Sequence, residues 1–258
     1  MFTKEELKQQ MKEMGIRPSH TLMIHTSLRA VGPTEGRGDG LIDAFLEYLT
    51  EGLLLIPTHT WGSTGRTGVY DVRSTETCIG TLPALAIARK DGFRSLHPTH
   101  SLCAFGKGAE EYVKGEEDAL SPAPVGGCWD RLGDVKAKIL LIGVGYNRNT
   151  FIHTLDERLD IPDRLGSPFA VTIYDREGNA LQRTMRPHSS SIGDVSAHYV
   201  NFEGPVIALG GQTSGKLGNA EVKIVDATIC REVVARIYSR ADYDVCKEIH
   251  TIPEALYM

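Results

Sequence analysis

The stretch "KILLIGVGYNRNTFIHTLDE", residues 138–157, joins a strand, a glycine-rich turn and the start of a helix. Its apolar run is bounded by a turn and is typical of a strand that is covered on both faces. Asn149 or Thr150 supplies a helix N-cap, which places His153 in the first helical turn, with carboxylates three and four residues further on. A strand, turn and helix in this order predict an α/β fold.

The rest of the chain repeats this alternation. Apolar runs predict three further strands, and amphipathic stretches bounded by glycines predict three helices between them. The strands are expected at 21–28, 53–58 and 101–106, and the helices at 38–52, 79–92 and 107–115. This order indicates three α/β/α layers around a central mixed, largely parallel sheet.

The pattern changes after Pro162. Residues 169–185 predict two strands around a "DREGN" turn, and residues 220–240 return to a strand followed by a helix. We interpret this part as a β-rich insertion and a closing unit. No linker divides the chain, so a single domain over residues 1–258 is expected.

The composition indicates a globular protein without a nucleic-acid partner. Asp and Glu number 33 and Lys and Arg 28, giving a formal net charge of −5, whereas binding a phosphate backbone needs clustered basic residues. The longest apolar run, 53–56, is far shorter than the roughly 20 residues of a membrane span. Residues 1–15 predict a capped helix rather than a signal peptide, and five widely spaced cysteines indicate reduced thiols. We therefore expect a cytoplasmic protein, monomeric or homodimeric, without a membrane partner.

Polar clusters follow or adjoin four of the predicted strands. They are "HTSLRAVGPTEGRGDG" (25–40), "PTHTWGSTGRTG" (57–68), "HPTHS" (97–101) and "GVGYNRNTFIHTLDE" (143–157). Ligands of α/β proteins bind at the carboxyl ends of parallel strands, so these clusters are expected to converge at one edge of the sheet.

The position of His153 allows two interpretations. A helix N-terminus lowers the pKa of an imidazole, while Asp156 and Glu157 favour its protonated form if they contact it. Such a histidine suits general-base catalysis, in which it takes a proton and is then stabilised by a carboxylate. The alternative is a capping histidine beside a solvated acidic face.

The pair His97 and His100 has the spacing of metal ligands. Pro98 disfavours a helix there, so the rings need not face the same way, and no acidic residue or cysteine lies close in sequence. We expect no metal. A metal hydrolase that uses this pair together with His188 stays as an alternative.

Taken together, the chain resembles the antibiotic N-acetyltransferase family, which includes the aminoglycoside 3-N-acetyltransferases. The resemblance covers nearly the whole chain and depends on motifs in the family's order. These are "HTSLRAVG" with "GDGLIDAF", "LLLIPTHTW", "HPTHSLCAFG", "ILLIGVGYNRNTFIHTLDERLDIP" and "GKLGNAEVKIVDA".

The resemblance implies an aminoglycoside 3-N-acetyltransferase-like fold, acetyl-CoA as donor, and the 3-amine of a 2-deoxystreptamine ring as acceptor. It implies catalytic roles for His153 and Asp156, with His25 at the first strand end. It also implies that one strand-end segment and three further residues bind CoA: Ser27, Leu28, Arg29, Ala30, Val31 and Gly32, with Thr99, Ser101 and Phe105.

The mechanism that fits these implications is direct transfer with His153 as general base, oriented by Asp156 or Glu157. An aliphatic amine is mostly protonated near neutral pH, so a base must release its lone pair before it attacks a thioester. Cys103 offers a competing covalent route. Carboxylates that could hold a polycationic acceptor are Asp71, Asp156, Glu157 and Asp160.

Two departures from the family's motifs bear on the acceptor. Asp156 stands where many of the aminoglycoside enzymes have glutamate, and Thr99-His100 stands where some have an acidic residue. The acceptor is therefore open to alternatives, such as an amino sugar on a nucleotide. A non-catalytic CoA-binding protein is a further alternative.

Overall fold

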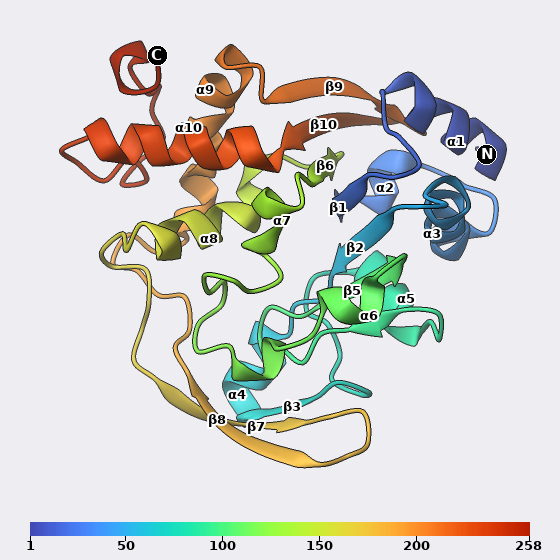
Figure 1. Ribbon diagram of the computed structural model, residues 1–258, viewed down its shortest axis with the longest axis horizontal. Coiled ribbons are helices and arrows are strands. Elements are labelled where there is room, and N and C mark those ends of the chain that lie inside the picture. The colour runs from blue at the N-terminus through green and yellow to red at the C-terminus, as the bar shows by residue number, and fades with distance from the viewer.

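A seven-stranded sheet forms the middle layer of the computed structural model, which describes residues 1–258 (Figure 1). A second, three-stranded sheet lies at one end of the molecule. The strands are β1 (Thr21–Thr26), β2 (Leu53–Pro57), β3 (Val69–Asp71), β4 (Phe93–Arg94), β5 (Leu102–Gly106), β6 (Lys138–Ile142), β7 (Phe169–Tyr174), β8 (Ala180–Met185), β9 (Gln212–Leu217) and β10 (Ala220–Asp226).

Helices cover both faces of the large sheet. The α-helices are α1 (Lys4–Glu13), α2 (Leu28–Val31), α3 (Arg37–Tyr48), α4 (Trp61–Thr67), α5 (Thr81–Ala88), α6 (Ala109–Tyr112), α7 (Arg131–Asp134), α8 (Phe151–Arg158), α9 (Glu203–Ala208) and α10 (Ala227–Arg240). Short 3-10 helices are η1 (Glu116–Asp118), η2 (Tyr146–Arg148), η3 (Val195–Phe202) and η4 (Glu254–Leu256). None of these helices is long and apolar enough to cross a membrane.

The strand order of the large sheet is β4-β5-β2-β1-β6-β10-β9. The central strands β2, β1 and β6 are parallel to one another, and every other neighbouring pair is antiparallel. The predicted mixed sheet and three layers are confirmed, but the expectation that the sheet is largely parallel is wrong. The flanking strands enter by short turns or from loops, and such connections allow antiparallel pairing.

Alternate side chains of the central strands enter separate cores. On β1, Met23 packs with α8 and α10, whereas Leu22 and Ile24 pack with α1, α3 and α5. The strand residues are apolar on both sides because each face is covered by helices. The two layers of helices on opposite sides of the sheet account for the continuous apolar runs in the sequence.

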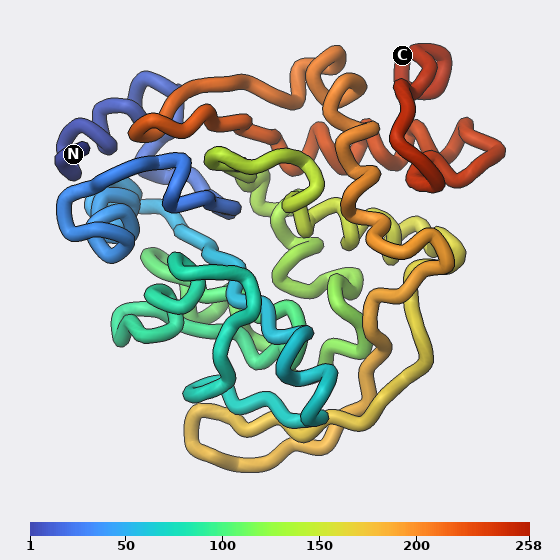
Figure 2. The backbone as a smooth tube through the Cα atoms, turned by 180° about the vertical axis from the view of Figure 1, so that it is seen from behind, coloured from blue at the N-terminus to red at the C-terminus, as the bar shows by residue number.

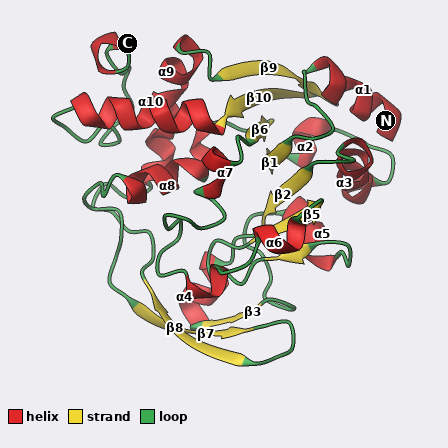
Figure 3. Cartoon of the chain, viewed as in Figure 1, coloured by secondary structure: helices red, strands yellow, loops and turns green.

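The small sheet is formed by the predicted hairpin β7–β8 and by β3. Figure 2 shows the hairpin from behind, beside the cyan segment that contains β3. Loops 159–168 and 186–194 connect the hairpin to the main body and run along one side of the molecule (Figure 3). The β-rich insertion is therefore attached at the end of the sheet where the polar clusters were predicted.

Candidate active site

A cavity of about 920 Å³ lies at the carboxyl ends of β1, β2 and β6. Its wall includes residues 24–26 at the end of β1, 56–57 at the end of β2 and 147–150 after β6. Thr99 and His100 join it because β5 is antiparallel to β2, with Leu102 opposite Pro57. All four polar clusters therefore contribute to one cavity, as the positions of the strand ends predicted.

His153 lines this cavity from the first turn of α8. Its Nδ1 atom lies 2.6 Å from the hydroxyl oxygen of Tyr199, and the same hydroxyl donates to Asp156 Oδ2 at 2.5 Å. A tyrosine hydroxyl has one hydrogen and a carboxylate only accepts, so Tyr199 accepts the Nδ1–H of His153. The lone pair of His153 is then on Nε2. His153, Tyr199 and Asp156 form a chain of hydrogen bonds that fixes the tautomer of the imidazole.

Burial determines the protonation of this chain. It lowers the pKa of His153 well below its usual value, and His188, His59 and Arg164 act in the same direction. It raises the pKa of the Asp156 carboxyl to about 6, while the Tyr199 hydrogen bond and Arg164 oppose that rise. At neutral pH the imidazole is therefore uncharged and the carboxylate ionised, as the hydrogen-bond assignment requires.

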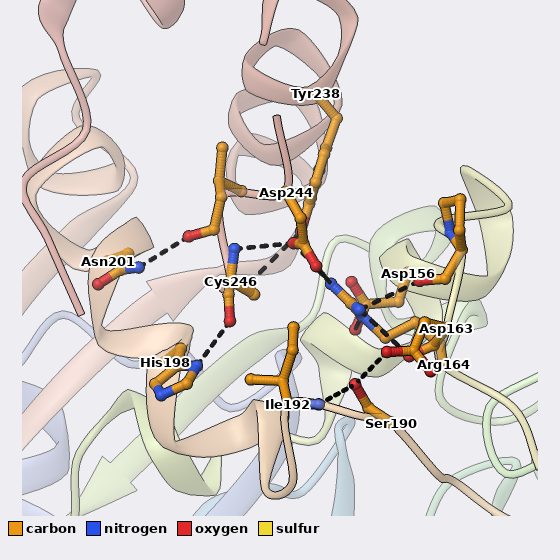
Figure 4. A network of polar contacts seen from close by, with 12 residues as sticks. Asp156, Asp163, Arg164, Ser190, Ile192, His198, Asn201, Tyr238, Asp244 and Cys246 are labelled. Atoms are coloured by element: carbon orange, nitrogen blue, oxygen red, sulfur yellow. Dashed lines mark hydrogen bonds and ion pairs between the residues drawn. The ribbon is translucent and has the colours of Figure 1, made fainter. Parts of the chain in front are cut away.

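Arg164 lies beside the oxygen of Asp156 that also accepts the Tyr199 hydrogen bond. Its guanidinium Nη2 donates to both carboxylate oxygens of Asp244, at 2.7 and 2.9 Å, and its Nε lies 3.6 Å from Asp156 Oδ2. Figure 4 shows Arg164 between the two carboxylates. Asp156 and Arg164 are buried, and Asp244 is partly exposed. The buried carboxylate of Asp156 is thus partly compensated by a cation that has its own second partner.

Histidines surround His153 in the cavity. The rings of His153 and His188 are 3.9 Å apart between centroids, those of His188 and His100 are 5.1 Å apart, and those of His100 and His59 are 4.6 Å apart. His25 lines the same cavity beside Trp129. Burial lowers the pKa of His25 to about 3, so it is a neutral group at the end of β1.

The buried loop before β5 holds His97 outside the cavity lining. Its Nδ1 accepts the backbone N–H groups of Thr99 (3.2 Å) and His100 (2.9 Å), and its Nε2 lies 3.0 Å from the carbonyl oxygen of Ser121. With Nδ1 an acceptor, Nε2 carries the hydrogen and donates to that carbonyl. Both ring nitrogens are engaged, which leaves none to coordinate a metal. This argues against the metal hydrolase that needs His97.

Glu157 lies next to Asp156 in sequence but contacts neither His153 nor the cavity. Its carboxylate accepts hydrogen bonds from the Ser121 hydroxyl and the Ala123 backbone N–H, and one oxygen is 3.5 Å from His188 Nε2. Glu157 therefore anchors the 121–123 loop. The expectation that it orients His153 is wrong, because the hydrogen bond from Nδ1 goes to Tyr199 and not to a carboxylate of α8.

The segment Ser27–Gly32 continues from the cavity wall as the single helical turn α2. Ser27 caps this turn by accepting from the Ala30 N–H. The N–H groups of Ala30, Val31 and Gly32 are bonded within this turn, and that of Ser27 bonds to the Ile142 carbonyl. The N–H groups of Leu28 and Arg29, at the start of the helix, have no acceptor within it and can donate to a ligand. Asn219 packs against α2 through a hydrogen bond of its N–H to the Val31 carbonyl (3.0 Å), which explains the late "GKLGNAE" motif.

Two residues expected to bind CoA point elsewhere. The Ser101 hydroxyl is fully buried and donates to the Thr58 carbonyl oxygen at 2.8 Å. Phe105 has no exposed surface and lies in the core under α3 and α5. Of the three residues predicted around β5, Thr99 alone lines the cavity. Phe105 faces the core from within β5, whereas Ser101 lies just before the strand and is held by Thr58.

The family model described as aminoglycoside 3-N-acetyltransferase matches residues 23–239. The chain belongs to the aminoglycoside 3-N-acetyltransferase family. The predicted family, the predicted fold and the prediction that the chain is an acetyltransferase are confirmed. A relative from Salmonella sp, aminoglycoside N(3)-acetyltransferase III, is 22% identical over 254 residues, which cover 88% of either protein.

Solved structures of the family share the fold. A histidine-to-alanine mutant of aminoglycoside acetyltransferase AAC(3)-IVa in complex with a gentamicin has a TM-score of 0.79 and 21% identity, covering 93% of this chain and 89% of that one. AAC-IIIb in a binary complex with CoASH has a TM-score of 0.76 and 19% identity, covering 89% of this chain and 93% of that one.

Tyr199 is the residue of this site that sequence reasoning did not find. It lies in η3, 46 residues after His153. The surrounding "SAHYVN" has no strand period and no motif that indicates a site. No local signal could have identified it, because its role depends on a contact between distant segments.

Proposed function

We propose that the chain is an acetyl-CoA-dependent N-acetyltransferase of the cytoplasm, in which His153 is the general base. The acceptor that the family implies is the 3-amine of a 2-deoxystreptamine aminoglycoside, and an amino sugar on a nucleotide is the second candidate. The observation that carries the proposal is the hydrogen-bond chain from His153 Nδ1 through Tyr199 to Asp156, beside a cavity at the strand ends.

The chemistry follows from this tautomer. A primary amine has a pKa of about 10 and must lose a proton to solvent before it has a lone pair. The amine nitrogen then bonds to the thioester carbonyl carbon and gives a second proton to His153 Nε2. When the carbon–sulfur bond breaks, the sulfur leaves as thiolate and takes that proton from Nε2. Asp156 stabilises the transient imidazolium through Tyr199, without itself taking the proton.

The donor site follows from the wall beside His153. Residues 24–26 and Thr99 line the cavity. The chain leaves this wall at Ser27, and the N–H groups of Leu28 and Arg29 at the start of α2 are not used within the helix. These groups suit the amide and phosphate oxygens of CoA, and AAC-IIIb with CoASH shows that a protein of this fold binds that ligand. The Ser101 hydroxyl is engaged by Thr58, so we do not assign it to the thioester oxygen.

Direct transfer is favoured over an acyl-enzyme on Cys103. The Cys103 side chain is buried, and burial raises the pKa of its thiol to about 12. A thiol nucleophile reacts as thiolate, so this cysteine is unreactive at neutral pH. Incubation with acetyl-CoA alone, followed by intact mass measurement, is expected to show no acetyl adduct.

The test replaces His153 by alanine and measures CoA thiol release at saturating acetyl-CoA with a panel of amines. Loss of the base is expected to lower kcat by about 100-fold to 10,000-fold. His20→Ala is the control, because His20 lies just before β1, at the opposite end of the strand, and bonds to Arg17. A His153→Ala rate within a few-fold of the parent contradicts the proposal, as does stabilisation of the parent by CoA without turnover of any amine.

A further inference from the structure

The charges that line the cavity bear on the acceptor. Its lining contains one carboxylate, Asp194, and two guanidinium groups, those of Arg148 and Arg164. Five histidines contribute polar but mostly uncharged surface. A polycation would leave most of its ammonium groups without a partner in such a cavity, and removing an unpaired charge from water is costly.

The carboxylates that the sequence offered for a polycation are engaged elsewhere. Asp156 is 2% exposed and bonded to Tyr199, and Glu157 holds the 121–123 loop. Asp71 pairs with Arg73 at 2.7 Å, and Asp160 does not line the cavity. None of the four is available to an acceptor in the cavity.

Asp194, the one carboxylate in the lining, already accepts hydrogen bonds through one of its oxygens. Asp194 caps η3, where one of its oxygens accepts the Ser196 N–H at 3.1 Å and the Ser196 hydroxyl at 2.6 Å. Its other oxygen can pair with one ammonium group. The cavity therefore has the capacity for a single cationic group besides the amine that is acetylated.

Arg148 differs from Arg164 in having no partner. Arg164 is paired with Asp244 and lies near Asp156. Arg148 is exposed at the end of η2, lines the cavity and makes no hydrogen bond or ion pair through its side chain. A free guanidinium in a cavity of low negative charge favours an anionic group of the ligand, and phosphate or carboxylate matches its paired donors.

We infer that the acceptor is a monoamine that also bears an anionic group, of the amino sugar phosphate class, and that Arg148 pairs with that anion. The inference rests on the proposed function and names the substrate class for it. The imidazoles of the cavity and the Ser189 hydroxyl would then bind the sugar hydroxyls. Polycationic aminoglycosides are expected to be poor acceptors.

The experiment compares three probes by CoA thiol release: D-glucosamine, D-glucosamine 6-phosphate and gentamicin. For the parent, kcat/KM is expected to be highest for the phosphorylated sugar, by about tenfold over D-glucosamine. Arg148→Gln is expected to remove this preference by lowering kcat/KM for the phosphorylated sugar to about the value for D-glucosamine. Arg66→Gln, an exposed arginine outside the lining, is the matched control and should keep the preference.

Two outcomes overturn the inference without touching the proposed function. One is a higher kcat/KM for gentamicin than for the phosphorylated sugar. The other is that Arg148→Gln raises KM for acetyl-CoA and leaves the acceptor preference intact, since the anion at Arg148 would then belong to CoA. Absence of thiol release with every amine contradicts the proposed function itself. A failure of the inference alone would still leave thiol release with at least one amine.

Discussion

His153 and His97 both lie near the end of the large sheet, but His97 has no exposed surface and His153 is half-buried. His97 uses both ring nitrogens in hydrogen bonds to the backbone of its own loop and of Ser121. His153 uses Nδ1 for Tyr199 and makes no hydrogen bond through Nε2, while its ring lines the cavity. One histidine organises a loop, and the other has an unused basic nitrogen.

The comparison shows that residue type and the direction of the pKa shift do not separate a structural from a catalytic imidazole. Burial lowers the pKa of His97 and of His153, so the direction of the shift is shared. The two imidazoles differ in their hydrogen-bond partners. Backbone partners cannot change their charge, whereas Tyr199 connects His153 to an ionisable carboxylate. Protonation of His153 can therefore be stabilised through that chain, and protonation of His97 would break an acceptor contact.

Removing the link at Tyr199 should have the largest effect of the changes considered next. Tyr199→Phe keeps the ring in the core and deletes the hydroxyl between His153 and Asp156, so both lose a partner. We expect kcat to fall by about 10-fold to 100-fold, as for other groups that orient a catalytic residue. Steady-state kinetics measures the change, with circular dichroism to establish that the variant is folded.

A double-mutant cycle separates this positioning role from a packing role. If Tyr199 connects His153 to Asp156, then Asp156→Asn adds little to the loss already caused by Tyr199→Phe. Independent losses that multiply would show that the two residues act separately and would break the contrast with His97.

The pH dependence of the rate should sharpen the contrast in a second way. The pKa of Asp156 is raised to about 6, so the carboxylate takes a proton as pH falls through that value. The protonated form no longer needs the tyrosine hydrogen, and His153 loses its fixed tautomer. We expect kcat to fall by about tenfold per unit below pH 6. Rates of wild type and Asp156→Asn against pH test this, with Asp175→Asn, on the hairpin turn, as control.

The stability of the protein should change with pH in the opposite sense. An unfolded aspartate has a pKa near 3.8, so between that value and about 6 the native state binds more protons than the unfolded state. The contribution of Asp156 to the free energy of unfolding therefore decreases as pH rises through this window. Urea unfolding of wild type and Asp156→Asn should show this decrease in the difference between their free energies of unfolding, because the other titrating groups are common to both proteins. An equal slope in both proteins would refute the assigned pKa.

The sequence predicted the layers and the site edge from particular residues. The run "KILLIGVG" can only be a doubly covered strand, and "IPTHT" and "HTSL" place polar side chains where apolar runs stop. The position of His153 in the first turn of a helix also followed from local signals, and the structure agrees. These predictions succeed because hydrophobic periodicity and turn residues are local properties of the chain.

The strand directions and side-chain partners that the sequence did not predict depend on contacts between distant segments. The direction of β5 is set by pairing with β2, so the inward or outward placement of Ser101 and Phe105 was not readable from "SLCAFG". The assignment of the carboxylate beside His153 failed for the same reason. Asp156 and Glu157 have equivalent spacing on the helix, and Tyr199 and Ser121, from other segments, decide which one serves which role.

Replacing His97 should affect stability and leave chemistry largely unchanged. His97→Leu removes the acceptor of two buried backbone N–H groups and the donor to the Ser121 carbonyl. Unpaired buried groups cost about 1–3 kcal/mol each, so with three such groups we expect the free energy of unfolding to fall by at least about 3 kcal/mol. His97→Asn, whose amide can still accept near the Nδ1 position, should lose less. Urea unfolding measures both, and kcat of the folded His97→Asn protein should stay within about fivefold of wild type. A shifted pH–rate profile in His97→Asn would instead place this ring in the proton path, and the distinction between the two histidines would fail.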